Sequence, residues 1–177
     1  SNLRAIDLYQ RALEADPGFP LTYVSLAEAT INSTHLNGRK LVAVAPEVTT
    51  LLDHVDALSP DLPESIAARG WLAAEQYRTE DARALMERAL VLNPNDADTQ
   101  RRLGELHSRT GQPRAALDRY TLASQLDPLD FMTHVRRCLS LQDLAEYVAA
   151  EAACARAREL NATSFYGPIV TSYLEFG

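Results

Sequence analysis

The stretch ADTQRRLGELHSRTGQPRAALDRYTLASQLDP, residues 97–128, predicts two amphipathic helices joined by a tight turn. Pro113 stands where the second helix would begin, because its ring fixes φ at a helical value and the first turn needs no N–H from it. After it, Ala116, Tyr120 and Ala123 recur at the spacing i, i+4 and i+7, which places them on one helical face. We therefore expect a helical hairpin that packs through small residues and one tyrosine.

The pattern of this hairpin recurs with a period of 34 residues. Pro60, Pro94 and Pro128 close successive units, and Ala162 takes the next place. Two further positions keep the same period. A position for a small residue holds Gly70, Gly104 and Cys138, and a position for a large residue holds Met86, Tyr120 and Cys154. We call them the small slot and the large slot. The pattern resembles the tetratricopeptide repeat, a helix–turn–helix unit of about 34 residues. This resemblance implies an all-α fold, a superhelical solenoid of antiparallel helix pairs.

The repeats are expected to form one solenoid over 1–177. Its parts are a partial repeat at 1–19, a repeat with an insertion at 20–62, repeats at 63–96, 97–130 and 131–164, and a C-terminal helix at 165–177. The insertion, 31–47, is either a long ordered loop or an apolar tuck formed by Leu41, Val42 and Val44, and we favour the tuck. Pro46 is expected to open the helix that follows. Because the chain begins in mid-repeat, we expect a fragment of a larger, bacterial protein.

Composition and motifs exclude several classes of function. The chain has 177 residues, a net charge of −7 and 46% hydrophobic residues, which is typical of a folded protein without the basic surface that nucleic acids require. No apolar run reaches the length of about 18 residues that membrane insertion needs. The sequence contains no phosphate-binding glycine loop, no HExxH and no GxSxG, and its histidines share no metal-ligand spacing. We expect no enzyme activity, no cofactor and no metal.

Binding residues are predicted from the position of the first helix in each unit, because these helices line a concave groove in such stacks. Helical offsets from the small-residue slots place these side chains in or beside the groove: Trp71, Arg101, Arg102, Glu105, Val135, Arg136 and Leu139. Trp71 is either an anchor for a partner or a packing residue against the next repeat or the insertion. The arginines either form a basic strip for an acidic partner segment or pair with stack carboxylates such as Asp98.

Two pairs of residues at repeat positions leave alternatives open. Cys138 and Cys154 fall in facing slots of one hairpin, so they can form a disulfide or remain buried thiols; buried thiols are the expected outcome because they are commoner. Arg69 and Arg137 occupy a slot that holds Leu103 in the unit between them. Either their aliphatic stems pass along apolar neighbours to reach water, or the local packing is altered.

These patterns predict a non-catalytic scaffold for protein–protein interaction and regulation, which binds a partner segment in its concave groove. The alternatives are a small-ligand sensory domain and a homo-oligomer formed through the solenoid ends. Residues 5–29, the insertion and the LSPDLPES of 58–65 resemble the helical region of ToxR/CadC-like transcriptional regulators, and similar regions follow some bacterial adenylate cyclase domains. That resemblance implies a sensory role, with DNA binding in another domain. We expect a cytoplasmic location, or a periplasmic one in a membrane-anchored regulator.

Overall fold

The computed structural model describes residues 2–161. Within them the chain forms nine helices and no strand, which confirms the all-α prediction. The helix expected at 165–177 lies outside the described residues. The helices are α1 (Asn2–Ala15), α2 (Pro20–Leu36), α3 (Leu41–Leu58), α4 (Pro63–Glu75), α5 (Thr79–Leu92), α6 (Ala97–Arg109), α7 (Pro113–Leu126), α8 (Phe131–Asp143) and α9 (Tyr147–Leu160).

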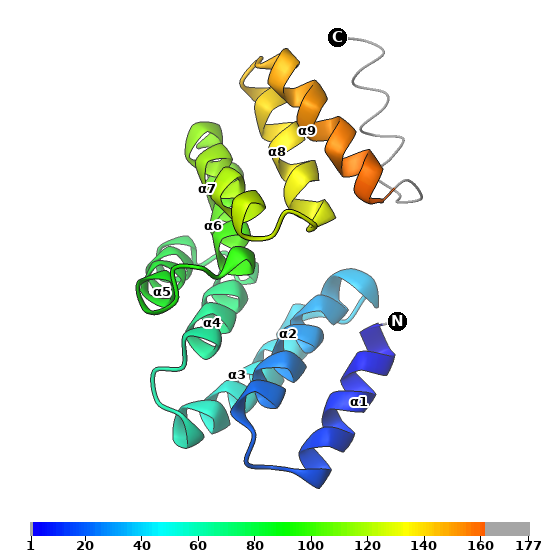
Figure 1. The fold of residues 1–177 in the computed structure, drawn as a ribbon. Coiled ribbons are helices and arrows are strands. Elements are labelled where there is room, and N and C mark those ends of the chain that lie inside the picture. Colours follow the sequence, from blue (N-terminus) through cyan, green and yellow to red (C-terminus); the bar gives the residue numbers. More distant parts are fainter. Residues whose placement is uncertain (1, 162–177) are drawn as a thin grey trace. The chain divides into compact units, whose positions relative to one another are not determined.

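The chain divides into two compact units, and each is described by itself. Unit 1, Ser1–Pro94, contains α1 to α5; α2 packs antiparallel to α3, α4 to α5, and α1 lies against α2 (Figure 1). Unit 2, Asn95–Gly177, contains the antiparallel pairs α6/α7 and α8/α9, with α8 also packed against α7. The pair is therefore the structural element that repeats along the chain.

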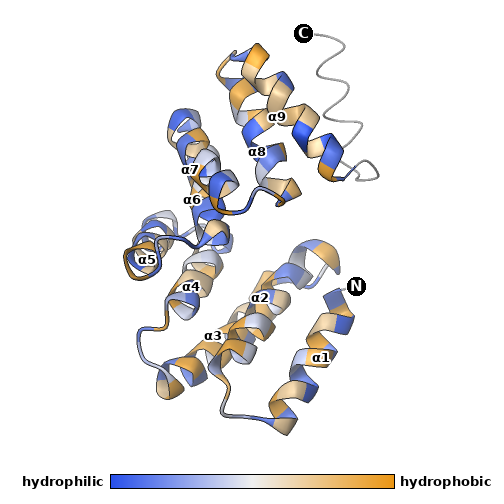
Figure 2. Cartoon of the chain, in the orientation of Figure 1, coloured by the Kyte–Doolittle hydropathy of each residue, from blue (hydrophilic) through white to orange (hydrophobic). Residues whose placement is uncertain are grey.

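The helices are amphipathic and bury their apolar sides within these pairs. Figure 2 shows hydrophobic and hydrophilic residues alternating along most helices, as expected when one face is buried and the other meets water. In unit 2 a core cluster joins α7, α8 and α9; its members are Leu117, Cys138, Leu141, Ala150, Ala153 and Cys154. Because Cys138 and Leu141 of α8 belong to this cluster, the opposite face of α8 points away from the core. None of the described helices combines the length and the apolar character needed to cross a membrane.

The small and large slots of the repeat face each other inside the hairpins. A Cβ atom on Gly70 of α4 would lie 2.9 Å from Cγ of Met86 on α5. A Cβ atom on Gly104 of α6 would lie 2.7 Å from Cε1 of Tyr120 on α7. Non-bonded carbon atoms do not approach so closely, so each pair reaches its spacing because the small slot lacks a side chain.

The α8/α9 hairpin fills the same slots with a disulfide bond between Cys138 of α8 and Cys154 of α9. Both residues are fully buried, and their Cα atoms are 5.0 Å apart. The expectation of free thiols is therefore wrong. Facing slots of an antiparallel helix pair bring the two Cα atoms to a separation that a disulfide can bridge, about 4.4–6.8 Å.

The insertion lengthens two helices instead of forming a loop. Helix α2 continues to Leu36 and α3 already begins at Leu41, so Pro46 lies inside α3 and does not open it. The proline costs one backbone hydrogen bond, to the carbonyl of Val42, and that residue is 79% exposed, so water can satisfy the carbonyl. The predicted tuck is only partly present, because Val44 is fully buried whereas Val42 is not.

Candidate partner-binding surface

The first helices of unit 2, α6 and α8, begin with the same side-chain cap. The carboxylate of Asp96 accepts hydrogen bonds from the N–H groups of Asp98, at 3.1 Å, and Thr99, at 3.2 Å. Asp130, one repeat later, accepts from the equivalent two N–H groups of α8 at 3.1 and 3.2 Å. An aspartate in this position satisfies N–H groups that have no partner inside the helix. The two helices therefore present their first turns in equivalent register.

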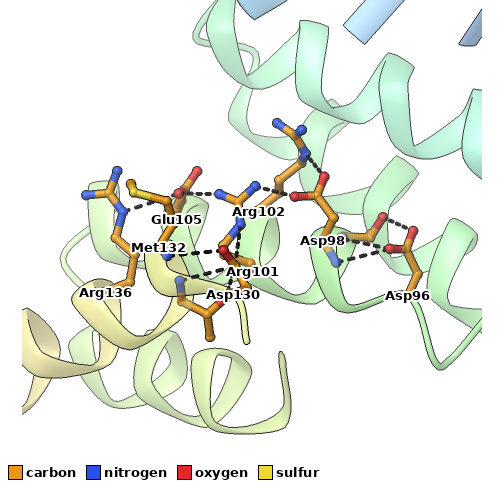
Figure 3. A network of polar contacts seen from close by, with 10 residues as sticks. Asp96, Asp98, Arg101, Arg102, Glu105, Asp130, Met132 and Arg136 are labelled. Carbon is orange, nitrogen blue, oxygen red and sulfur yellow. Dashed lines mark hydrogen bonds and ion pairs between the residues drawn. The ribbon is translucent and has the colours of Figure 1, made fainter. Parts of the chain in front are cut away.

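Arg101 stands at the centre of a charged network on α6 (Figure 3). Its guanidinium donates to Glu105 at 2.7 Å and to Asp98, and its Nε lies 3.6 Å from Oδ2 of Asp130. Only 15% of the side chain is exposed. Burial by itself lowers the pKa of Arg101, but the carboxylates of Asp98 and Glu105 outweigh this effect and raise it. The cation is therefore fixed in place by its anionic neighbours.

The network crosses from α6 to α8 and balances its charges. Oε1 of Glu105 accepts from Arg101 and also from Nε of Arg136 on α8, at 3.2 Å, while Arg102 pairs with Asp98 (Figure 3). The arginines of the predicted basic strip, Arg101, Arg102 and Arg136, are thus paired with carboxylates of the same unit. Their side chains are therefore in the ion-paired environment that was the second alternative. Whether they also bind a partner stays a prediction.

The remaining predicted binding residues differ in accessibility. The side chain of Trp71 in α4 is buried, with 6% of its surface exposed, and Val135 of α8 is also buried. These two side chains therefore offer little area to a partner in this conformation. Leu139, by contrast, is only partly buried. Burial of the tryptophan depends on neighbours that helical periodicity does not specify, and its role as an anchor stays a prediction.

Sequence reasoning missed two residues of this surface, Met132 and Asp130. Met132 is partly buried and precedes Arg136 and Leu139 at the spacing i, i+4 and i+7, so helical periodicity could have found it. Asp130 could have been found as the repeat equivalent of the cap residue Asp96. We call the combined surface the α6–α8 face; it comprises Asp98, Arg101, Glu105, Asp130, Met132, Arg136 and Leu139.

Asp98 is expected to make the stability of the chain depend on acid pH. Burial raises the pKa of its carboxyl, but Arg102 and Arg101 outweigh that effect and hold it below the ordinary value of 3.8. A lowered pKa in the folded state contributes stability above pH 3.8, and the contribution is lost as the pH falls through the lowered pKa. Asp98→Asn should therefore cost about 1 kcal/mol or less at neutral pH, since the carboxylate is partly exposed.

Urea denaturation at a series of pH values measures this effect. The difference between wild type and Asp98→Asn should shrink as the pH falls below 3.8 and through the lowered pKa of Asp98. Asp118→Asn is the matched control, because Asp118 lies on the exposed side of α7, and it should show a small difference at every pH. A difference for Asp98→Asn that stays constant across the acid range would contradict the assignment.

Comparisons with known proteins give the fold a name. No family model matches the chain. Over 81 residues it is 33% identical to mouse anaphase-promoting complex subunit 7, which covers 46% of this chain and 14% of the mouse protein. The human protein of the same name is 32% identical over 81 residues, again 14% of its length. The match is thus to a small part of these curated relatives.

Two kinds of solved structure share the arrangement of helices. A crystal structure of MamA matches with a TM-score of 0.63 and 18% identity, over 89% of this chain and 86% of the other. YrrB, a TPR protein with an unusual peptide-binding site, matches with a TM-score of 0.60 and 17% identity, over 97% of this chain and 86% of the other. The chain has the tetratricopeptide-repeat fold. The fold expected from the 34-residue period is therefore confirmed, while the likeness to ToxR/CadC-like regulators stays a prediction.

Among residues 2–161, no group of three or more histidine, cysteine, aspartate or glutamate side chains is arranged to hold a metal ion. The carboxylates of the face are engaged by arginines. What the face offers chemically is recognition: fixed charges beside partly exposed apolar side chains.

Proposed function

We propose that the chain is a non-catalytic protein-interaction module that binds an extended or helical segment of a partner along the α6–α8 face. The observation that carries this proposal is the placement of two partly exposed apolar side chains, Met132 and Leu139, on either side of the ion-paired Arg136. Apolar anchors beside a positioned arginine are a composition typical of binding surfaces. The fold shared with peptide-binding YrrB supports the same class of function.

The charged network would prepare this face for a partner. Arg101 is largely buried and held by Glu105 and Asp98, so little ordering of its side chain would be needed on binding. Arg136 is 35% exposed and has a single bond to Glu105 at 3.2 Å, which leaves donors of its guanidinium for a partner. A carboxylate of the partner would bind there, next to apolar residues that contact Met132 and Leu139.

The larger context is part of the proposal. The resemblance of residues 5–29 to ToxR/CadC-like regulators supports a place for this module in a bacterial regulatory protein. In that setting, binding along the α6–α8 face would pass a signal to a domain outside this chain. The sequence encoded on either side of residues 1–177 tests the setting, because a DNA-binding or cyclase domain next to them is expected and the absence of both would contradict it.

A peptide-display selection tests the binding function itself. Peptides enriched on the immobilised wild-type chain are synthesised, and their dissociation constants are measured for wild type and for Arg136→Glu and Leu139→Ser. Each substitution should weaken binding by about tenfold or more, which corresponds to ~1.4 kcal/mol. Circular dichroism verifies that both variants fold.

Arg156→Glu on α9 is the matched control, because Arg156 is also a partly exposed arginine in one ion pair, with Glu159 at 3.0 Å. It should bind the selected peptides as wild type does. Equal affinities of wild type and Arg136→Glu, or an equal loss in Arg156→Glu, would contradict a site on the α6–α8 face.

A further inference from the structure

Two arginines at the same repeat position have opposite environments. Arg69 of α4 and Arg137 of α8 are 68 residues apart, which is two repeat periods. The guanidinium of Arg69 donates to Oδ1 of Asp53 and to Oδ2 of Asp56, both at 2.8 Å and both on α3, the second helix of the preceding pair. In unit 1, therefore, two carboxylates on the preceding helix neutralise the arginine.

The preceding helix of unit 2 lacks these carboxylates. Two repeat periods after Asp53 and Asp56, the equivalent positions on α7 hold Thr121 and Ser124, which carry no charge. The hydroxyl of Ser124 donates to the carbonyl of Thr121 at 2.8 Å, so it is already engaged within the helix. Helix α7 packs directly against α8. The carboxylate pair that Arg69 uses has no counterpart at Arg137.

Arg137 is accordingly left without a counter-ion among residues 2–161. Its Nε is buried and has no hydrogen-bond partner, and no ion pair forms at its guanidinium within the described part of the chain. Burial lowers the pKa of Arg137, and no carboxylate offsets that effect. A partly buried cation without an anion or a full set of acceptors is costly to the folded state.

Packing does not require a charge at this position. Leu103 of α6 occupies the same slot in the intervening repeat and is fully buried there. A leucine would therefore fit between α7 and α8, and it would avoid the cost of the unpaired guanidinium. Arg137 therefore destabilises the folded chain without being needed for packing. This indicates that an anion from outside the chain pairs with its guanidinium.

We propose that Arg137 is a receptor for a carboxylate, supplied by an aspartate or glutamate side chain of a partner polypeptide, at the α7–α8 seam. The carboxylate would bind the terminal nitrogens of the Arg137 guanidinium, as Asp53 and Asp56 bind a terminal nitrogen of Arg69. This site is separate from the α6–α8 face, so the inference does not depend on the proposed function. It is a second point at which an acidic residue is recognised.

Titration of the full chain with a hexaglutamate peptide, followed by the NMR signal of the Arg137 Nε–H group, tests this site. Hexaglutamine serves as the uncharged probe. Hexaglutamate should shift the signal saturably and hexaglutamine should not. Arg137→Leu should lower the affinity for hexaglutamate by about tenfold while leaving the melting temperature unchanged or higher.

A transplant of the unit 1 carboxylates gives a second, independent variant. Thr121→Asp/Ser124→Asp should supply Arg137 with its own anions, raise the melting temperature and abolish the hexaglutamate-induced shift. Arg136→Glu, which alters the α6–α8 face, should leave the shift at Arg137 in place, and this separates the two sites.

Two results would overturn the proposal. One is an unshifted Arg137 signal in the presence of saturating hexaglutamate. Another is equal hexaglutamate affinity in wild type, Arg137→Leu and the double aspartate variant.

Discussion

Replacing Tyr120 by alanine is expected to lower the free energy of unfolding by about 3–5 kcal/mol. Tyr120 is the largest of the fully buried side chains in the described residues, with 1% of its surface exposed. Its ring fills the space that Gly104 leaves open on α6, where a Cβ atom would lie 2.7 Å from it. Gly104 has no side chain that could move into the cavity, so the site can collapse only if the two helices shift.

Urea denaturation followed by circular dichroism measures this loss. Tyr147→Ala is the matched control, since Tyr147 carries the same side chain at the start of α9 and is 64% exposed. That change should cost within about 0.5 kcal/mol of zero. Tyr120→Phe keeps the ring and should retain most of the stability. If Tyr120→Ala were no more destabilising than Tyr147→Ala, the tight α6–α7 pairing would be contradicted.

Loss of the disulfide is the second large effect, with an expected cost of about 3 kcal/mol. Cys138 and Cys154 are 16 residues apart in sequence, and their bond joins α8 to α9 inside a core cluster that also contains Leu117 of α7. Reduction releases a closed loop of that length in the unfolded chain and removes the covalent link between the helices. Dithiothreitol supplies the two electrons and is oxidised to its cyclic disulfide.

The α4/α5 hairpin suggests the control for this experiment. Cys138→Gly/Cys154→Met reproduces the residues that fill the same slots in α4 and α5, so it should fold without a cross-link. Its stability should be independent of dithiothreitol, whereas the wild type should lose about 3 kcal/mol on reduction. Equal denaturation curves for the wild type with and without dithiothreitol would show that the bond contributes nothing.

The fold could be predicted because its determinants repeat. Gly104 and Tyr120 must face each other for the two helices to pack closely. The same small and large slots recur every 34 residues, so each repeat gives independent support for the same helix pair. The lengthened α2 and α3 could not be predicted in the same way. Pro46 normally indicates a helix start, and only the exposure of the preceding turn shows why α3 tolerates it.

The candidate site was predicted less completely than the fold. Periodicity placed Arg101, Arg136 and Leu139 on the first helices, but it could not tell that Glu105 would be shared by both arginines. Pairing depends on the distance between helices that are distant in sequence. Burial of Trp71 depends on neighbours in the same way, and so does the contrast between the neutralised Arg69 and the unpaired Arg137.

The most direct measurement of the central claim is a map of where a bound peptide contacts the chain. Nitrogen–proton NMR spectra are recorded while a peptide from the display selection is added to the full chain. Binding along the α6–α8 face predicts the largest shifts at Glu105, Met132, Arg136 and Leu139. Shifts confined to exposed residues of α7 and α9, with these signals unchanged, would contradict it.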